Sequence, residues 1–117
     1  MTIDRKALDT VRALASDSAP DLLEQVVRLY FESALELLGR LRAGMAANDQ
    51  EAVRGAAHSL KSSSANLGAN RLADLCKQLE FAARAGELGP DLPHIEEVEA
   101  EYALVRTALE KELGATV

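Results

Sequence analysis

His58 and Lys61 are the residues whose types and spacing suggest chemistry in this chain. They lie three positions apart in a segment of small residues, AAHSLKSSSANLGANRL (56–72). Side chains three apart share one face of a helix, so the imidazole would have a cation beside it. An imidazole becomes a usable nucleophile when one ring nitrogen is held and the other is free. The alternative is an ordinary polar histidine on the surface of an amphipathic helix.

The helix expected to carry His58, over residues 49–67, has two faces at about 100° per residue. The face expected to point into the core contains Val53, Ala56, Leu60, Ser64 and Leu67. The face shared with His58 contains Arg54, Lys61, Ser62 and Ala65. His58 should therefore be exposed. The hydroxyls of Ser63 and Ser64 are expected to bond back to the carbonyls of Ser59 and Leu60.

Glu80 is the carboxylate expected to face His58. Gly68 is a natural stop for the first helix, and the next helix, over residues 70–85, should return antiparallel to it. Residues 78–81 then lie level with His58, and Glu80 is the ionisable residue among them. A carboxylate there would accept a bond from one imidazole nitrogen, fix the tautomer and leave the other nitrogen free.

Five helical segments and no strand are expected, over residues 4–15, 20–47, 49–67, 70–85 and 93–113. Ser18 is a candidate N-cap for the second helix, and Pro20 suits its first turn. Aromatic residues make up only 3% of the chain, and Ala and Leu dominate, which favours helix-on-helix packing. Short connections predict antiparallel neighbours. The expected fold is all-α, an antiparallel up-down four-helix bundle with a short additional N-terminal helix, forming a single domain over residues 1–117.

Charge and composition exclude several classes of partner. The net charge of −6 argues against nucleic acid or an anionic membrane surface as the main partner. No apolar run approaches the roughly 18 residues of a membrane span, and the N-terminus lacks the apolar core of a signal peptide. The single cysteine, Cys76, fits a reducing cytosol and is expected to be a buried small hydrophobe. The expected location is therefore cytoplasmic.

The segment from Ala56 to Glu80 resembles the signature of histidine-containing phosphotransfer (HPt) domains of multistep two-component phosphorelays. The matching residues are His58, Lys61, the run of small residues, Leu67-Gly68-Ala69, Leu72, Leu75-Cys76 and Leu79-Glu80. The resemblance implies that His58 accepts a phosphoryl group from the aspartyl phosphate of one receiver domain and passes it to the aspartate of another. It also implies that Lys61 neutralises phosphoryl charge and that Glu80 orients His58. Ser62 stands where the family usually has glycine.

The resemblance further implies that receiver domains of a hybrid histidine kinase or of a response regulator are the partners. The residues expected to serve receiver docking or phosphoryl clearance are Arg54, Ser62, Ala65 and Ala69, with an exposed leucine of the second helix such as Leu22 or Leu29. The chain shows no glycine-rich nucleotide loop and no acidic cluster for Mg²⁺. It is therefore expected to be a monomeric phosphoryl carrier without a bound cofactor, the receiver supplying Mg²⁺ and the aspartate.

Two other functions are compatible with the same residues. One is a helical adaptor bundle that binds a partner helix and whose histidine is not phosphorylated. The other is an enzyme that uses His58 and Glu80 as an acid–base pair. Metal binding is not expected, because His58, Cys76 and His94 lack ligand spacing, and His94 reads as a plain helix-start residue. A stand-alone protein and a domain of a larger sensor kinase fit equally well.

Overall fold

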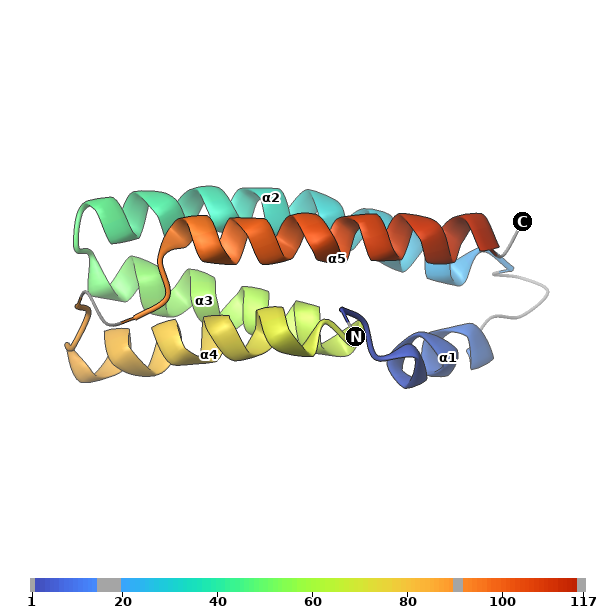
Figure 1. Cartoon of the computed structure of the whole chain (residues 1–117), viewed down its shortest axis with the longest axis horizontal. Helices are drawn as coiled ribbons and strands as arrows, with labels where there is room; N and C mark the ends of the chain where they lie inside the picture. The colour runs from blue at the N-terminus through green and yellow to red at the C-terminus, as the bar shows by residue number, and fades with distance from the viewer. Residues whose placement is uncertain (1, 15–19, 90–91, 116–117) are drawn as a thin grey trace.

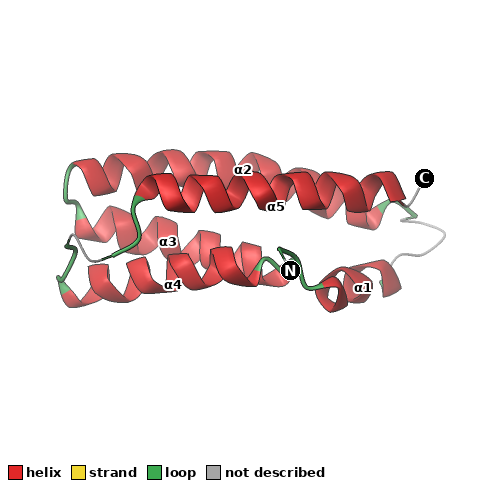
Figure 2. Ribbon diagram, in the orientation of Figure 1, coloured by secondary structure: helices red, strands yellow, loops and turns green. Residues whose placement is uncertain are grey.

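The computed structural model describes residues 2–14, 20–89 and 92–115, and this part of the chain is helical without strands. Five helices follow one another: α1 (Arg5–Ala13), α2 (Leu22–Ala46), α3 (Gln50–Asn66), α4 (Asn70–Ala85) and α5 (Ile95–Ala115). Figure 1 shows α2 and α5 in one layer, α3 and α4 in the other, and α1 beyond the end of the α3–α4 pair. The expected all-α class and four-helix bundle are confirmed (Figure 2). None of the described helices is long and apolar enough to cross a membrane.

The helix ends agree with the expected ones to within two residues. Asp49 caps α3, as its side chain accepts a hydrogen bond from the backbone N–H of Ala52 at 3.1 Å. Gly68 ends α3 with a φ of +80°, a left-handed conformation that glycine adopts without strain. Asp21 occupies the N-cap position of α2. The expected cap Ser18 lies outside the described residues.

Helix α1 closes the end of the bundle at which α3 turns into α4. The backbone N–H of Asp4 donates to the carbonyl of Gly68 at 2.8 Å, and Ile3 and Leu8 are buried. On the other side, Arg5 and Arg12 each lie 3.0 Å from the carboxylate of Glu112 in α5. The α3–α4 turn is therefore covered by the first residues of the chain.

The core side of α3 is nearly the one that the helical spacing predicts. Val53 and Leu60 are fully buried, and the small side chains of Ala56 and Ala57 are buried beside them on the same helix. The expected bond of Ser63 is confirmed: its hydroxyl donates to the carbonyls of Ser59 and Leu60. The expectation for Ser64 was wrong, because its buried hydroxyl instead hydrogen-bonds the hydroxyl of Tyr30 in α2 at 2.8 Å.

Candidate functional site

His58 lies on the middle of α3 and is exposed, as expected, with 55% of its side chain accessible. The opposite face of the same helix packs into the core, where Ala57 and Leu60 have no accessible surface. The imidazole is thus presented to solvent by a rigid element. That arrangement leaves at least one ring nitrogen open to a second molecule.

Glu80 reaches His58 from the neighbouring helix α4, and only 1% of its side chain is accessible. Its Oε2 atom lies 2.9 Å from Nδ1 of His58. Its Oε1 atom lies 2.5 Å from Nζ of Lys61. The structure therefore brings His58, Lys61 and Glu80 together, as the sequence predicts. The carboxylate is buried, and the imidazole is exposed to solvent.

The partners of Glu80 decide its ionisation. Burial on its own would raise the pKa of Glu80, but hydrogen bonds from Lys61 and His58 outweigh burial and hold the pKa below its usual value. An ionised carboxylate can only accept hydrogen bonds, so Nδ1 of His58 must be the donor. In the neutral imidazole the lone pair then lies on Nε2, the nitrogen that does not face Glu80.

Lys61 lies beside the histidine on α3 and is only 26% accessible. Its Nζ atom is 5.9 Å from the ring centroid of Phe81, an exposed aromatic residue of α4, and Nζ of Lys77 is 5.6 Å from the same ring. The lysine is therefore held between Glu80 and Phe81. Its ammonium group is positioned near the imidazole before any ligand arrives.

Arg84 is a member of this cluster that the sequence reasoning missed. Its Nη2 atom donates to Oε2 of Glu80 at 2.8 Å, the same oxygen that accepts from His58. The available signal was the spacing, because residues four apart on a helix are neighbours. Glu80 is thus a buried anion with three basic partners.

The residues expected to surround the phosphoryl group differ in how exposed they are. Ser62 and Ala65 are exposed, so their small side chains leave the surface next to His58 open. Arg54 is half-buried and forms an ion pair with Glu51. Docking at Ala69 was wrong, since Ala69 is fully buried. The cause is the covered turn, in which a Cβ atom on Gly68 would lie only 2.3 Å from the carbonyl oxygen of Asp4.

The remaining candidate residues, apart from Leu22, lie where their types suggested. Leu29 is 65% exposed, whereas Leu22 is half-buried and so offers less surface than expected. Cys76 is fully buried, and burial raises the pKa of its thiol to about 12. His94 is exposed and directly precedes α5, where its carbonyl accepts from the first turn. Among the described residues, no three His, Cys, Asp or Glu side chains are grouped to hold a metal.

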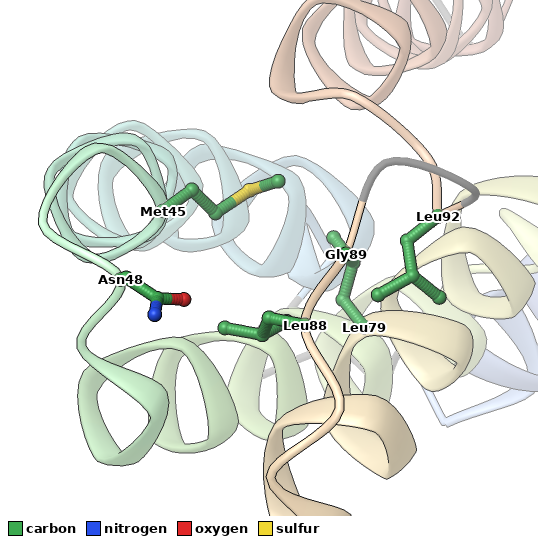
Figure 3. Close-up of a pocket in the computed structure, with 6 residues that line it drawn as sticks. All are labelled: Met45, Asn48, Leu79, Leu88, Gly89 and Leu92. Carbon is green, nitrogen blue, oxygen red and sulfur yellow. The ribbon is translucent and has the colours of Figure 1, made fainter.

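A separate apolar cavity of about 200 Å³ lies at the end of the bundle that contains the α2–α3 turn (Figure 3). Its walls are Met45, Asn48, Leu79, Leu88, Gly89 and Leu92. None of these residues belongs to the cluster around His58. The cavity therefore takes no part in the site.

Comparison with known proteins gives one consistent result. A family model described as the Hpt domain matches residues 25–108. The chain is 38% identical to histidine-containing phosphotransfer protein B (HptB) from Pseudomonas aeruginosa PAO1, whose crystal structure superposes with a TM-score of 0.79 over 97% of this chain and 96% of that one.

Two curated relatives extend the comparison. Histidine-containing phosphotransfer protein 2 of Arabidopsis thaliana is 26% identical over 103 residues, which are 86% of this chain. The sensor protein TorS of Escherichia coli K12 is 37% identical over 87 residues, 74% of this chain. The chain spans 66% of the length of the plant protein and 9% of TorS. The residues that the family model matches contain α3 and α4, and so all four residues of the cluster around Glu80. The chain belongs to the Hpt domain family of histidine-containing phosphotransfer proteins.

Proposed function

We propose that this protein carries a phosphoryl group on Nε2 of His58 between the aspartates of two receiver domains in two-component signalling. The observation that supports this most strongly is the contact between Nδ1 of His58 and the buried carboxylate of Glu80 at 2.9 Å. With Glu80 ionised, that contact favours the hydrogen on Nδ1 of His58 and the lone pair on Nε2. The exposed nitrogen is the one that a docked receiver would meet.

The transfer step balances with these residues alone and the receiver. The lone pair of Nε2 of His58 attacks phosphorus, the N–P bond forms, and the P–O bond of the aspartyl phosphate breaks, so that aspartate leaves as a carboxylate. Nδ1 keeps its proton, and the ring gains a positive charge that Glu80 faces at 2.9 Å. Transfer to the second receiver is the reverse of this step, with the electron pair returning to Nε2.

Lys61 is proposed to neutralise the phosphoryl group. Its ammonium lies between Glu80 and Phe81, and Glu80 also contacts the exposed imidazole. A phosphoryl group brings about two negative charges, and phosphoryl transfer depends mainly on positioning and charge stabilisation. Ser62 and Ala65, both exposed, are proposed to leave room for the group and for the receiver.

We also propose that the receiver supplies what this cluster lacks. The acceptor aspartate and the Mg²⁺ would lie on the partner, so the chain acts as a carrier and not as an autonomous enzyme. Leu29, an exposed leucine of α2, is proposed to lie in the apolar part of the docking surface with Phe81. Action as a monomer in the cytoplasm completes the proposal.

The test is phosphoryl transfer from a phosphorylated receiver in the presence of Mg²⁺. The protein should acquire label that is stable to base and labile to acid, as expected for a phosphoramidate bond. His58→Gln should acquire none, while the control His94→Gln should be labelled like the wild type. Equal labelling of His58→Gln would refute the carrier function, and intact partner binding without any labelling would favour the adaptor bundle.

A further inference from the structure

We propose that Arg84 is a positioning residue that keeps Glu80 ionised and directed at His58 while Lys61 is engaged by the phosphoryl group. The proposal rests on the proposed carrier function for its consequence, but its structural part concerns only this chain. The starting observation is that Arg84 and His58 share one oxygen of Glu80, at 2.8 and 2.9 Å, whereas Lys61 holds the other oxygen at 2.5 Å.

Lys61 faces two anions in turn. Before phosphorylation its nearest anion is Glu80, whose side chain is only 1% accessible. When a phosphorylated receiver docks, its phosphoryl group stands against Nε2 of His58 before the N–P bond forms, and the lysine is drawn toward this new anion. A buried carboxylate that loses its cation carries a large desolvation penalty, and such a group neutralises by taking up a proton.

Protonation of Glu80 would make the exposed nitrogen of His58 unable to act as a nucleophile. A protonated carboxyl group is a donor, so it would favour the His58 tautomer in which Nδ1 accepts and Nε2 carries the hydrogen. That tautomer has no lone pair on the exposed nitrogen. A second cation that stays with Glu80 prevents this outcome, and Arg84 is the residue in place to provide it.

The charges of the cluster agree with this assignment. In the phosphorylated state, Nδ1 keeps its proton and the ring is positive. Lys61, Arg84 and the ring then balance Glu80 and a phosphoryl group of about two negative charges. Without Arg84 the cluster would hold one uncompensated negative charge next to a buried carboxylate.

A simpler role for Arg84 is available and makes a different prediction. Arg84 lies in the last turn of α4, where a cation is favourable next to the helix C-terminus whatever lies nearby. Its side chain is 58% accessible, so its ion pair contributes modestly to stability. A helix-end role would leave the tautomer of His58 unchanged, and this difference defines the experiment.

The first measurement uses long-range ¹H–¹⁵N spectra of the imidazoles at about pH 8, above the usual titration range of histidine. Lys61→Gln imitates a lysine that has left Glu80. We expect wild type, Arg84→Gln and Lys61→Gln to keep the hydrogen on Nδ1 of His58. The double variant Lys61→Gln/Arg84→Gln should move it to Nε2.

The matched control is Lys61→Gln/Lys77→Gln. Lys77 is an exposed cation of the same helix, and its ammonium lies near Phe81 at 5.6 Å from the ring centroid. This variant has the same net charge as the test variant and should keep the hydrogen on Nδ1. If both double variants behave alike, or if Lys61→Gln/Arg84→Gln keeps the wild-type tautomer, Arg84 does not position Glu80.

The second measurement is the equilibrium ratio of phosphohistidine to aspartyl phosphate with a cognate receiver. Arg84→Gln should lower it roughly three- to fivefold, the size of one ion pair at a half-exposed side chain. In a Glu80→Gln background the same substitution should change it by under about 1.5-fold, because no carboxylate remains to be held. Equal effects in both backgrounds would mean that Arg84 acts directly on the phosphoryl group or the receiver.

The two measurements separate the two proposals. If the wild type takes no label from any receiver, the carrier function fails, and the tautomer spectra still decide the role of Arg84. If the wild type is labelled but the spectra show no difference between the two double variants, the carrier function stands and the Arg84 proposal fails.

Discussion

Replacing Glu80 by methionine should remove the hydrogen bond that orients the imidazole of His58. The fold should remain nearly as stable as before. Methionine is unbranched, of similar length, and well suited to a buried position on α4. We expect the free energy of unfolding to change by less than about 1 kcal/mol in either direction. Phosphoryl uptake by His58 should be lost or strongly reduced.

The magnitude follows from two opposing effects. The substitution removes the partner of Lys61, His58 and Arg84, whose side chains are 26%, 55% and 58% accessible. The two more exposed pairs contribute about 0.5 kcal/mol each and the lysine pair about 1–2 kcal/mol, and all three cations reach water once released. Against this loss, the substitution also removes the penalty of several kcal/mol for burying a carboxylate.

Lowering the pH should reduce the free energy of unfolding of the wild type more than that of Glu80→Met. The basic partners hold the pKa of Glu80 below its usual value, so ionised Glu80 stabilises the folded state above the usual carboxyl pKa. That increment is lost as pH falls through the lower folded-state pKa. Glu80→Met has no such group, and its stability relative to wild type should rise over that pH range.

Urea unfolding followed by circular dichroism measures both effects. Leu72→Ala is the reference on the same helix, because Leu72 is fully buried and such truncations cost about 2–5 kcal/mol. If Glu80→Met loses as much as Leu72→Ala, Glu80 is required by the fold. The interpretation of Glu80 as a residue retained for the site would then be refuted.

Three further predictions concern residues that frame the site. Gly68→Ala should lower the free energy of unfolding by more than about 2 kcal/mol, from left-handed strain and from a clash at 2.3 Å with the carbonyl of Asp4; an unchanged midpoint in thermal unfolding would contradict the covered turn. Ser62→Gly should cost about 0.5 kcal/mol of stability and speed transfer from a receiver, and a slower rate in quenched-flow labelling would mean that the serine hydroxyl assists. Tyr30→Phe should cost about 1–3 kcal/mol because it leaves the buried hydroxyl of Ser64 without its partner, and Tyr30→Phe/Ser64→Ala should cost less than the two single changes added together.

The part of the site that depends on helix geometry was predictable from the sequence. The spacing on α3 places His58 and Lys61 on one exposed face, and the length of the turn at Gly68 sets the register that brings Glu80 opposite the histidine. Both follow from the regular rise and rotation of a helix. Helix boundaries followed for the same reason, since caps such as Asp49 and stops such as Gly68 are local.

The parts that escaped prediction depend on contacts between distant segments. Ala69 is buried because Asp4, far away in the sequence, bonds to Gly68 and covers the turn. Ser64 meets Tyr30 of α2, and a serine on the core face gives no sign of whether its hydroxyl will turn to a carbonyl or to another helix. These outcomes require the packing of α1 and α2, which helical periodicity does not contain.

The central claim is that Glu80 leaves Nε2 of His58 as the reactive nitrogen. The most direct measurement is ³¹P and ¹⁵N NMR of the ¹⁵N-labelled protein after phosphorylation by a receiver, with the phosphorus coupling assigned to one ring nitrogen. We expect the phosphoryl group on Nε2 of His58, with the hydrogen on Nδ1 still donated to Glu80. A phosphoryl group on Nδ1 of His58, or on His94, would contradict the account.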